Sequence, residues 1–86
     1  FMYKGQALYR MNRYDEALAA IENAIAIDPG ISSAWSNKGF ILIKQGKIEP
    51  AISAFDRALD IDPGNSEARQ GRLEAIRIKW PSYRDS

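Results

Sequence analysis

The most informative segment of the chain runs from Trp35 to Gly64 and reads WSNKGFILIKQGKIEPAISAFDRALDIDPG. Shifted by 34 residues, without gaps, it aligns with the segment from Phe1 to Gly30, FMYKGQALYRMNRYDEALAAIENAIAIDPG. A fixed period of this length indicates a repeat architecture, in which each unit packs on the next. Ten aligned positions are identical, and most of them are small or helix-ending residues: Lys4/Lys38, Gly5/Gly39, Leu8/Leu42, Ala17/Ala51, Ala20/Ala54, Ala24/Ala58, Ile27/Ile61, Asp28/Asp62, Pro29/Pro63 and Gly30/Gly64.

Apolar residues within each unit follow helical spacing. In the second unit Trp35, Gly39 and Leu42 recur at intervals of four and three residues, and a second apolar stripe runs from Ile48 to Leu59. This spacing places each set on one face of a helix. The small residues at the identical positions would let the two helices of a pair approach closely, so we expect them in the core.

Turn residues divide these stripes into separate helices. Gln45-Gly46-Lys47 separates the first stripe from the second, and Asp62-Pro63-Gly64 ends the second, because proline cannot continue a helix and glycine suits the turn that follows. The first unit follows the same plan. We therefore expect five helices, two in each repeat and one over residues 66–79, with Ser66 as one N-cap and either Ser32 or Ser33 as another.

This pattern resembles the tetratricopeptide repeat family, whose signature spaces aromatic, glycine, alanine and proline positions over 34 residues. The resemblance implies an all-α fold of antiparallel helix hairpins, stacked as a short right-handed solenoid, and a protein–protein interaction scaffold. Lys38 and Leu42 depart from the usual residues of that signature. The positions in register with the signature are Trp35, Gly39, Leu42, Ala51, Phe55, Ala58 and Pro63 in the second unit, and Phe1, Gly5, Leu8, Ala17, Ile21, Ala24 and Pro29 in the first.

The repeat boundaries predict the organisation of the chain. Residues 1–31 form a first repeat that is truncated at its N-terminus, 32–65 a second repeat, 66–79 a C-terminal capping helix and 80–86 a tail. About three stacked repeats are usually needed for stability. We therefore expect the chain to be a piece of a longer array, or to form a homo-oligomer through the exposed face of the first repeat.

The composition excludes several classes of protein. The 86 residues contain no Cys and no His, which removes disulfides, the usual cysteine and histidine metal ligands, and the commonest general base. We therefore expect no enzyme activity, no metal and no cofactor. No apolar run approaches the ~20 residues that span a bilayer, and no secretory signal is visible, so we expect no membrane association and a cytoplasmic location.

The small net charge of +1 conceals a segregation of charge between helices. Residues 1–14 and 32–47 each carry a charge of +3, and residues 66–79 carry +2. The alternate segments 15–28 and 48–62 carry −4 and −3. A basic surface raises the local concentration of anions, so the sequence favours an acidic or carboxyl-terminated peptide as the partner.

The resemblance also implies which residues line the concave face of the stack, since the family places the first helix of each pair there. Phe40 and Ile43 would supply an apolar anchor for a partner side chain, with packing of Phe40 in the core as the alternative. Aromatic and basic residues also interleave on these helices, so a single-stranded RNA-binding helical repeat is the alternative function. The implied groove residues are Met2, Gln6, Tyr9, Arg10, Ser36, Asn37, Phe40, Ile43, Lys44, Gln70 and Arg77.

Overall fold

The computed structural model describes the backbone of residues 2–81 and the side chains of residues 13–81. This part of the chain holds four helices and no strand, so the expected all-α fold is confirmed. The helices are α1 (Met2–Ile27), α2 (Ser32–Lys44), α3 (Ile48–Ile61) and α4 (Ser66–Lys79).

The expectation of five helices is wrong, because the two helices expected in the first repeat are one continuous helix, α1. In the second repeat Gly46 makes the turn between α2 and α3 with a φ of +80°, a left-handed conformation that suits glycine. The equivalent position in the first repeat is Asn12, which adopts that conformation less readily than glycine does. Without a glycine there, the helix continues through the position of the turn.

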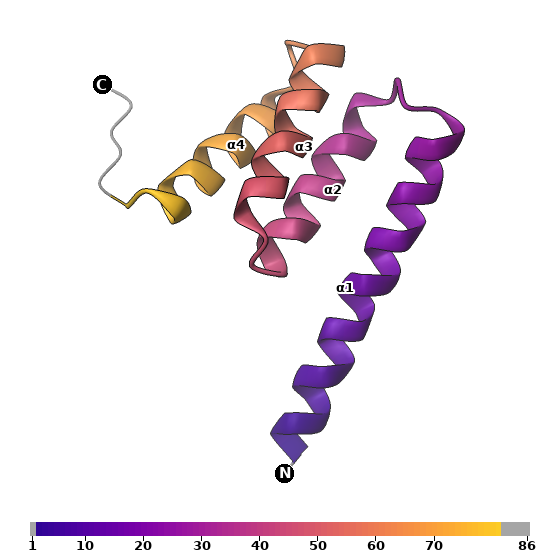
Figure 1. The fold of residues 1–86 in the computed structure, drawn as a ribbon, viewed down its shortest axis with the longest axis vertical. Coiled ribbons are helices and arrows are strands. Elements are labelled where there is room, and N and C mark those ends of the chain that lie inside the picture. Colours follow the sequence, from indigo (N-terminus) through magenta and orange to yellow (C-terminus); the bar gives the residue numbers. More distant parts are fainter. Residues whose placement is uncertain (1, 82–86) are drawn as a thin grey trace.

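The helices α2, α3 and α4 lie side by side, and α2 makes contact with each of the other three helices (Figure 1). Among the described helices, α1 contacts α2 alone. The N-terminal half of α1 runs away from the rest of the molecule (Figure 1). The second repeat and α4 therefore form a packed unit, and the first repeat is joined to it through the second half of α1.

The packed unit is centred on Phe55 of α3, whose side chain is fully buried. Gly39 of α2 and Gly71 of α4 both lie against this ring, so closely that a Cβ on either residue would overlap its atoms. Alanines surround the ring, because larger side chains would push the helices apart. The central cluster of buried residues is Leu42, Ala51, Ala54, Phe55, Ala58 and Ala68.

Polar contacts at the junctions between repeats recur at the 34-residue period. Trp35 Nε1 donates a hydrogen bond of 2.9 Å to the carbonyl oxygen of Pro29. At the next junction Arg69 Nη2 donates to the carbonyl oxygen of Pro63 at 3.0 Å. Both partners are shifted by one period. The start of α4 is therefore attached to the loop after α3 in the same way as the start of α2 is attached to the loop after α1.

An ion pair between successive repeats recurs in the same way. Lys38 Nζ lies 3.6 Å from Glu22 Oε2 between α2 and α1, and Arg72 Nε lies 2.6 Å from Asp56 Oδ1 between α4 and α3. Exposed ion pairs contribute only about 0.2–1 kcal/mol each. These ion pairs matter less for their energy than for what they show about the fold: α2 packs on α1 with the same geometry as α4 packs on α3.

A third contact links the end of one helix to the helix before it, at positions one period apart. Gln45 Nε2 donates to Asp15 Oδ1 at 2.6 Å, and the equivalent Lys79 Nζ lies 2.8 Å from Glu49 Oε2. The hydrogen bond from Lys79, together with its positive charge, lowers the pKa of Glu49 below the usual carboxyl value. Because folding lowers this pKa, the contact stabilises the fold above the unfolded-state pKa of Glu49. That contribution is lost as the pH falls through the folded-state value.

We expect Gly39→Ala to lower the free energy of unfolding by about 1–3 kcal/mol, because the core has no room for the added carbon. Its Cβ would lie 2.6 Å from two carbons of the buried Phe55 ring. This cost should exceed the gain of about 1 kcal/mol that alanine brings to a helix. Urea denaturation followed by circular dichroism measures the change.

Gly64→Ala is the matched control, because its Cβ would make only an ordinary contact with Asp62 Oδ1 at 3.4 Å. We expect this variant to stay close to the original stability. A Gly39→Ala variant as stable as the Gly64→Ala variant would contradict the packing described for Phe55.

Candidate functional site

Four of the predicted groove residues belong to the N-terminal half of α1. The side chains of Met2, Gln6, Tyr9 and Arg10 lie outside the described residues, although their backbone is helical. Their helix runs away from α2 instead of lying alongside it (Figure 1). In this arrangement they do not share a face with the predicted residues of α2.

Ser36 is not available to a partner, because its side chain is fully buried. Asn65 Nδ2 donates hydrogen bonds to Ser36 Oγ at 2.9 Å and to Ser32 Oγ at 2.8 Å. Asn65 Oδ1 also accepts a bond of 3.0 Å from the backbone N–H of Ala68, which caps the start of α4. Ser36 therefore helps to attach α4 to α2, a role that helical spacing alone does not reveal.

Phe40 and Ile43 are half-buried and pack against the core cluster. The ring of Phe40 meets that of Phe55 edge to face, with centroids 5.0 Å apart and an angle of 74° between the planes. Phe40 also lies beside Gly71 of α4. These contacts favour the alternative that Phe40 packs in the core, over its use as an anchor for a partner.

The remaining predicted residues, Asn37, Lys44, Gln70 and Arg77, are exposed. Gln70 and Arg77 line a shallow depression formed by α4 alone. Lys44 lines a different depression, beside Tyr14 and the turn after α2. The structure thus leaves these four side chains accessible without gathering them into one cavity.

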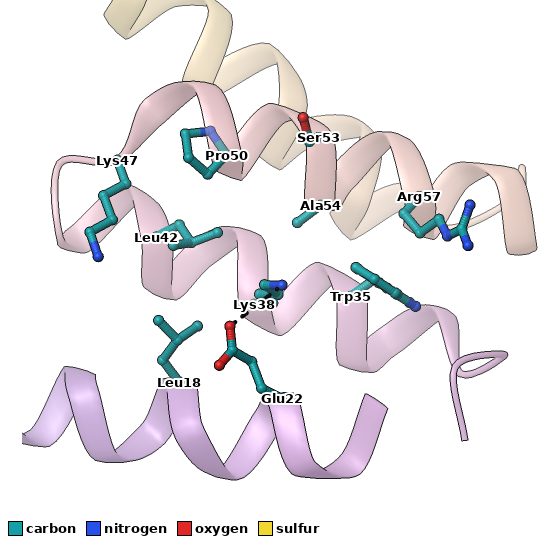
Figure 2. Close-up of a pocket in the computed structure, with 10 residues that line it drawn as sticks. All are labelled: Leu18, Glu22, Trp35, Lys38, Leu42, Lys47, Pro50, Ser53, Ala54 and Arg57. Carbon is teal, nitrogen blue, oxygen red and sulfur yellow. Dashed lines mark ion pairs between the residues drawn. The ribbon is translucent and has the colours of Figure 1, made fainter. Parts of the chain in front are cut away.

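Another groove is lined by residues of α1, α2 and α3, and α2 lies between the other two helices (Figure 2). Its volume is about 570 Å³, and its apolar surface includes Leu18, Trp35, Leu42 and Ala54. It shares no residue with the predicted face. We call it the Trp35 groove; its lining residues are Leu18, Glu22, Trp35, Lys38, Leu42, Lys47, Pro50, Ser53, Ala54 and Arg57.

The Trp35 ring is held in place and flanked by positive charge. Its Nε1 bonds to the carbonyl oxygen of Pro29, which fixes the ring relative to the loop after α1. Lys38 Nζ lies 5.2 Å from the ring centroid and the Arg57 guanidinium carbon 5.6 Å. Cations at such distances are attracted to an indole face, so Trp35 organises the basic side chains around it.

The rim of the groove carries an excess of positive charge. Lys38, Lys47 and Arg57 face a single carboxylate, Glu22, which pairs with Lys38. Within residues 13–81, Lys47 and Arg57 form no ion pair. From the sequence, Trp35 has the spacing of a core residue and the segment of α3 is acidic overall, so neither feature predicts this groove. The one signal for it is Arg57, the lone cation of that segment.

A sequence model of the tetratricopeptide repeat matches residues 4–66, which is more than two thirds of the chain. The chain belongs to the tetratricopeptide repeat family. Tetratricopeptide repeats generally mediate protein–protein interaction, and they are typically non-enzymatic scaffolds. A comparison with curated proteins gives no match.

Within the described residues, no helix of this tetratricopeptide repeat protein combines the length and apolar character needed to cross a bilayer. The same part of the chain holds no cluster of three or more acidic, histidine or cysteine residues suited to a metal ion.

We expect Asn65→Ala to cost about 2–4 kcal/mol of stability, because it removes the N-cap of α4 and leaves the buried Ser36 hydroxyl without this partner. Thermal and urea denaturation measure the effect. Ser66→Ala is the matched control, since Ser66 was the expected cap but the structure gives that role to Asn65. A larger loss from Ser66→Ala than from Asn65→Ala would show that the cap has been misassigned.

Proposed function

We propose that the chain is a protein–protein interaction module that holds an extended, acidic segment of a partner in the Trp35 groove. The observation that carries the proposal is the pairing of a partly buried indole ring with flanking cations in a groove that also has apolar lining residues. Aromatic and arginine side chains are the residues most often found at binding hot spots. The membership of an interaction family supports the same class of function.

The chemistry of the groove suits a segment that alternates acidic and apolar side chains. Leu18, Leu42 and Trp35 would receive an apolar side chain, and Lys47 and Arg57 would meet carboxylates at the rim. Both cations are available because they form no ion pair within the described side chains. Charge complementarity of this kind mainly increases the rate of association and the specificity.

We also propose a second contact surface for the partner, formed by the exposed residues of the predicted concave face. Asn37, Lys44, Gln70 and Arg77 would meet a partner that extends beyond the groove. We infer that the chain is divided as its sequence predicts, into a first repeat over residues 1–31, a second over 32–65 and α4 as a C-terminal cap. The support for the cap is Leu73, which stands where a continuing repeat has the close-packing glycine of Gly39.

Selection from a random dodecapeptide library, displayed to the immobilised protein, tests the proposal. We expect the bound peptides to be enriched in Asp and Glu around an apolar residue. The affinity of a selected peptide is then read from the fluorescence of Trp35 in a Trp80→Phe background, which leaves Trp35 as the sole tryptophan. Arg57→Glu should weaken binding about tenfold, which corresponds to 1.4 kcal/mol.

Lys44→Glu is the matched control, since it reverses one exposed charge on the predicted face without touching the groove. We expect it to leave the affinity nearly unchanged. Loss of binding in Lys44→Glu, with Arg57→Glu unaffected, would move the site to the concave face. Enrichment of basic peptides, or tighter salt-dependent binding of single-stranded RNA, would overturn the proposal.

A further inference from the structure

The second half of α1 leaves exposed a face that is buried in the equivalent helix α3. In α3 the four small and aromatic positions that pack against neighbouring helices are at most 2% exposed. In α1, Ala20 is exposed and its three companions are only partly buried. The equivalent sets are Ala17, Ala20, Ile21 and Ala24 in α1, and Ala51, Ala54, Phe55 and Ala58 in α3.

In the second repeat this face is covered by α2, and the first repeat contains a segment with the same pattern as α2. Gly39 and Leu42 of α2 contribute to the packing around Phe55, and the identical residues Gly5 and Leu8 stand one period earlier. Residues 2–14 are therefore the segment of this chain that is patterned to pack on residues 15–27.

Within one molecule these two segments cannot meet, because they belong to the same uninterrupted helix. At a rise of 1.5 Å per residue, positions 5 and 21 are separated by about 24 Å along the axis. Their equivalents, Gly39 and Phe55, are in direct contact. Residues 2–14 of the same molecule therefore do not supply the cover, whereas the same segment of a second molecule can reach this face.

We propose that a second copy of the chain supplies this cover, in a domain-swapped dimer formed by two antiparallel α1 helices. Residues 2–14 of each copy pack on residues 15–27 of the other, so the interface is reciprocal and closes on itself. If position 5 pairs with position 21, as 39 does with 55, the twofold axis passes near residue 13. This proposal does not depend on the function proposed for the Trp35 groove.

Charge favours this occupant. Residues 1–14 carry +3 and no acidic side chain, whereas residues 15–28 carry −4 and no basic one. Antiparallel pairing places the basic half of each α1 beside the acidic half of its partner, where opposite charges attract. Parallel pairing would place like charges together, so the pattern also selects the orientation.

The dimer would complete a surface that a single copy lacks. The positions of Met2, Gln6, Tyr9 and Arg10 would be brought beside α2 from the partner copy, next to Asn37. The Trp35 groove would stay open, because Leu18 and Glu22, which line it, do not belong to the exposed set. The dimer would therefore assemble the predicted concave face from two chains.

The first test is the molar mass in solution, measured by light scattering and sedimentation over a range of micromolar concentrations. We expect twice the 9.7 kDa mass of the chain. Ala20→Glu should give a monomer, because it places a charge in the exposed apolar face. Ala19→Glu, the matched control, should remain a dimer, since Ala19 is exposed and its equivalent Ser53 is exposed as well. A strict monomer for the unmodified chain, or a dimer for Ala20→Glu, would overturn the proposal.

Two further variants separate a swapped dimer from simple contact between exposed faces. Asn12→Gly restores the residue that turns the chain at Gly46, so we expect a helical monomer in which residues 2–14 fold back. Leu8→Glu should also be monomeric, but an equimolar mixture of Leu8→Glu with Ala20→Glu should recover dimers, because one of the two reciprocal contacts is intact in the mixed pair. A dimeric Asn12→Gly variant, or a mixture that recovers no dimer, would exclude the exchange of helices.

Discussion

The packing of one aromatic ring between two glycines determines the arrangement of the second repeat and α4. Phe55 is fully buried, and the backbones of α2 and α4 approach it at Gly39 and Gly71, where no side chain intervenes. Burying such a ring contributes about 1.5–3 kcal/mol by itself. Its larger effect is geometric, because it fixes the distances of two helices from a third. The alanines around it and the edge-to-face contact with Phe40 depend on the same close approach.

The first repeat shows what happens when the same design lacks its turn and its ring. Ile21 stands where the second repeat has Phe55, and Asn12 stands where it has Gly46. The helix then continues and the repeat does not close, although its later half still makes the contacts that join one repeat to the next. Both surfaces of interest follow from this difference. The Trp35 groove uses the half of α1 that docks on α2, and the exposed alanine face is the half of the hairpin that has no partner within the molecule.

Much of the fold could be predicted from the sequence, because periodicity and helix-ending residues are local signals. The 34-residue period, the segments of α2, α3 and α4, and the glycine turn at Gly46 were all expected, and the structure has them. The continuous helix α1 was not expected, since the alignment of the two repeats carried the turn over to a position that has no glycine. The N-cap of α4 was assigned to Ser66, one residue after Asn65, which makes the capping bond.

The candidate site was harder to predict, because it depends on which side chains face each other across helices. Ser36 has the spacing of a groove residue, yet Asn65, 29 positions later, reaches it and helps to bury it. Trp35 has the spacing of a core residue and packs against the core cluster, but its ring also lines an open groove beside Arg57. Net charge per helix identifies the basic segments of the sequence, but it does not give the faces on which the individual lysines lie.

Residue-resolved hydrogen exchange over a series of denaturant concentrations would test most directly whether Phe55 joins α2, α3 and α4 into one unit. We expect the slowest amides of these three helices to converge on one free energy of opening, since none can leave while the ring is enclosed. An α4 that opens at a clearly lower free energy than α2 and α3 would contradict this packing.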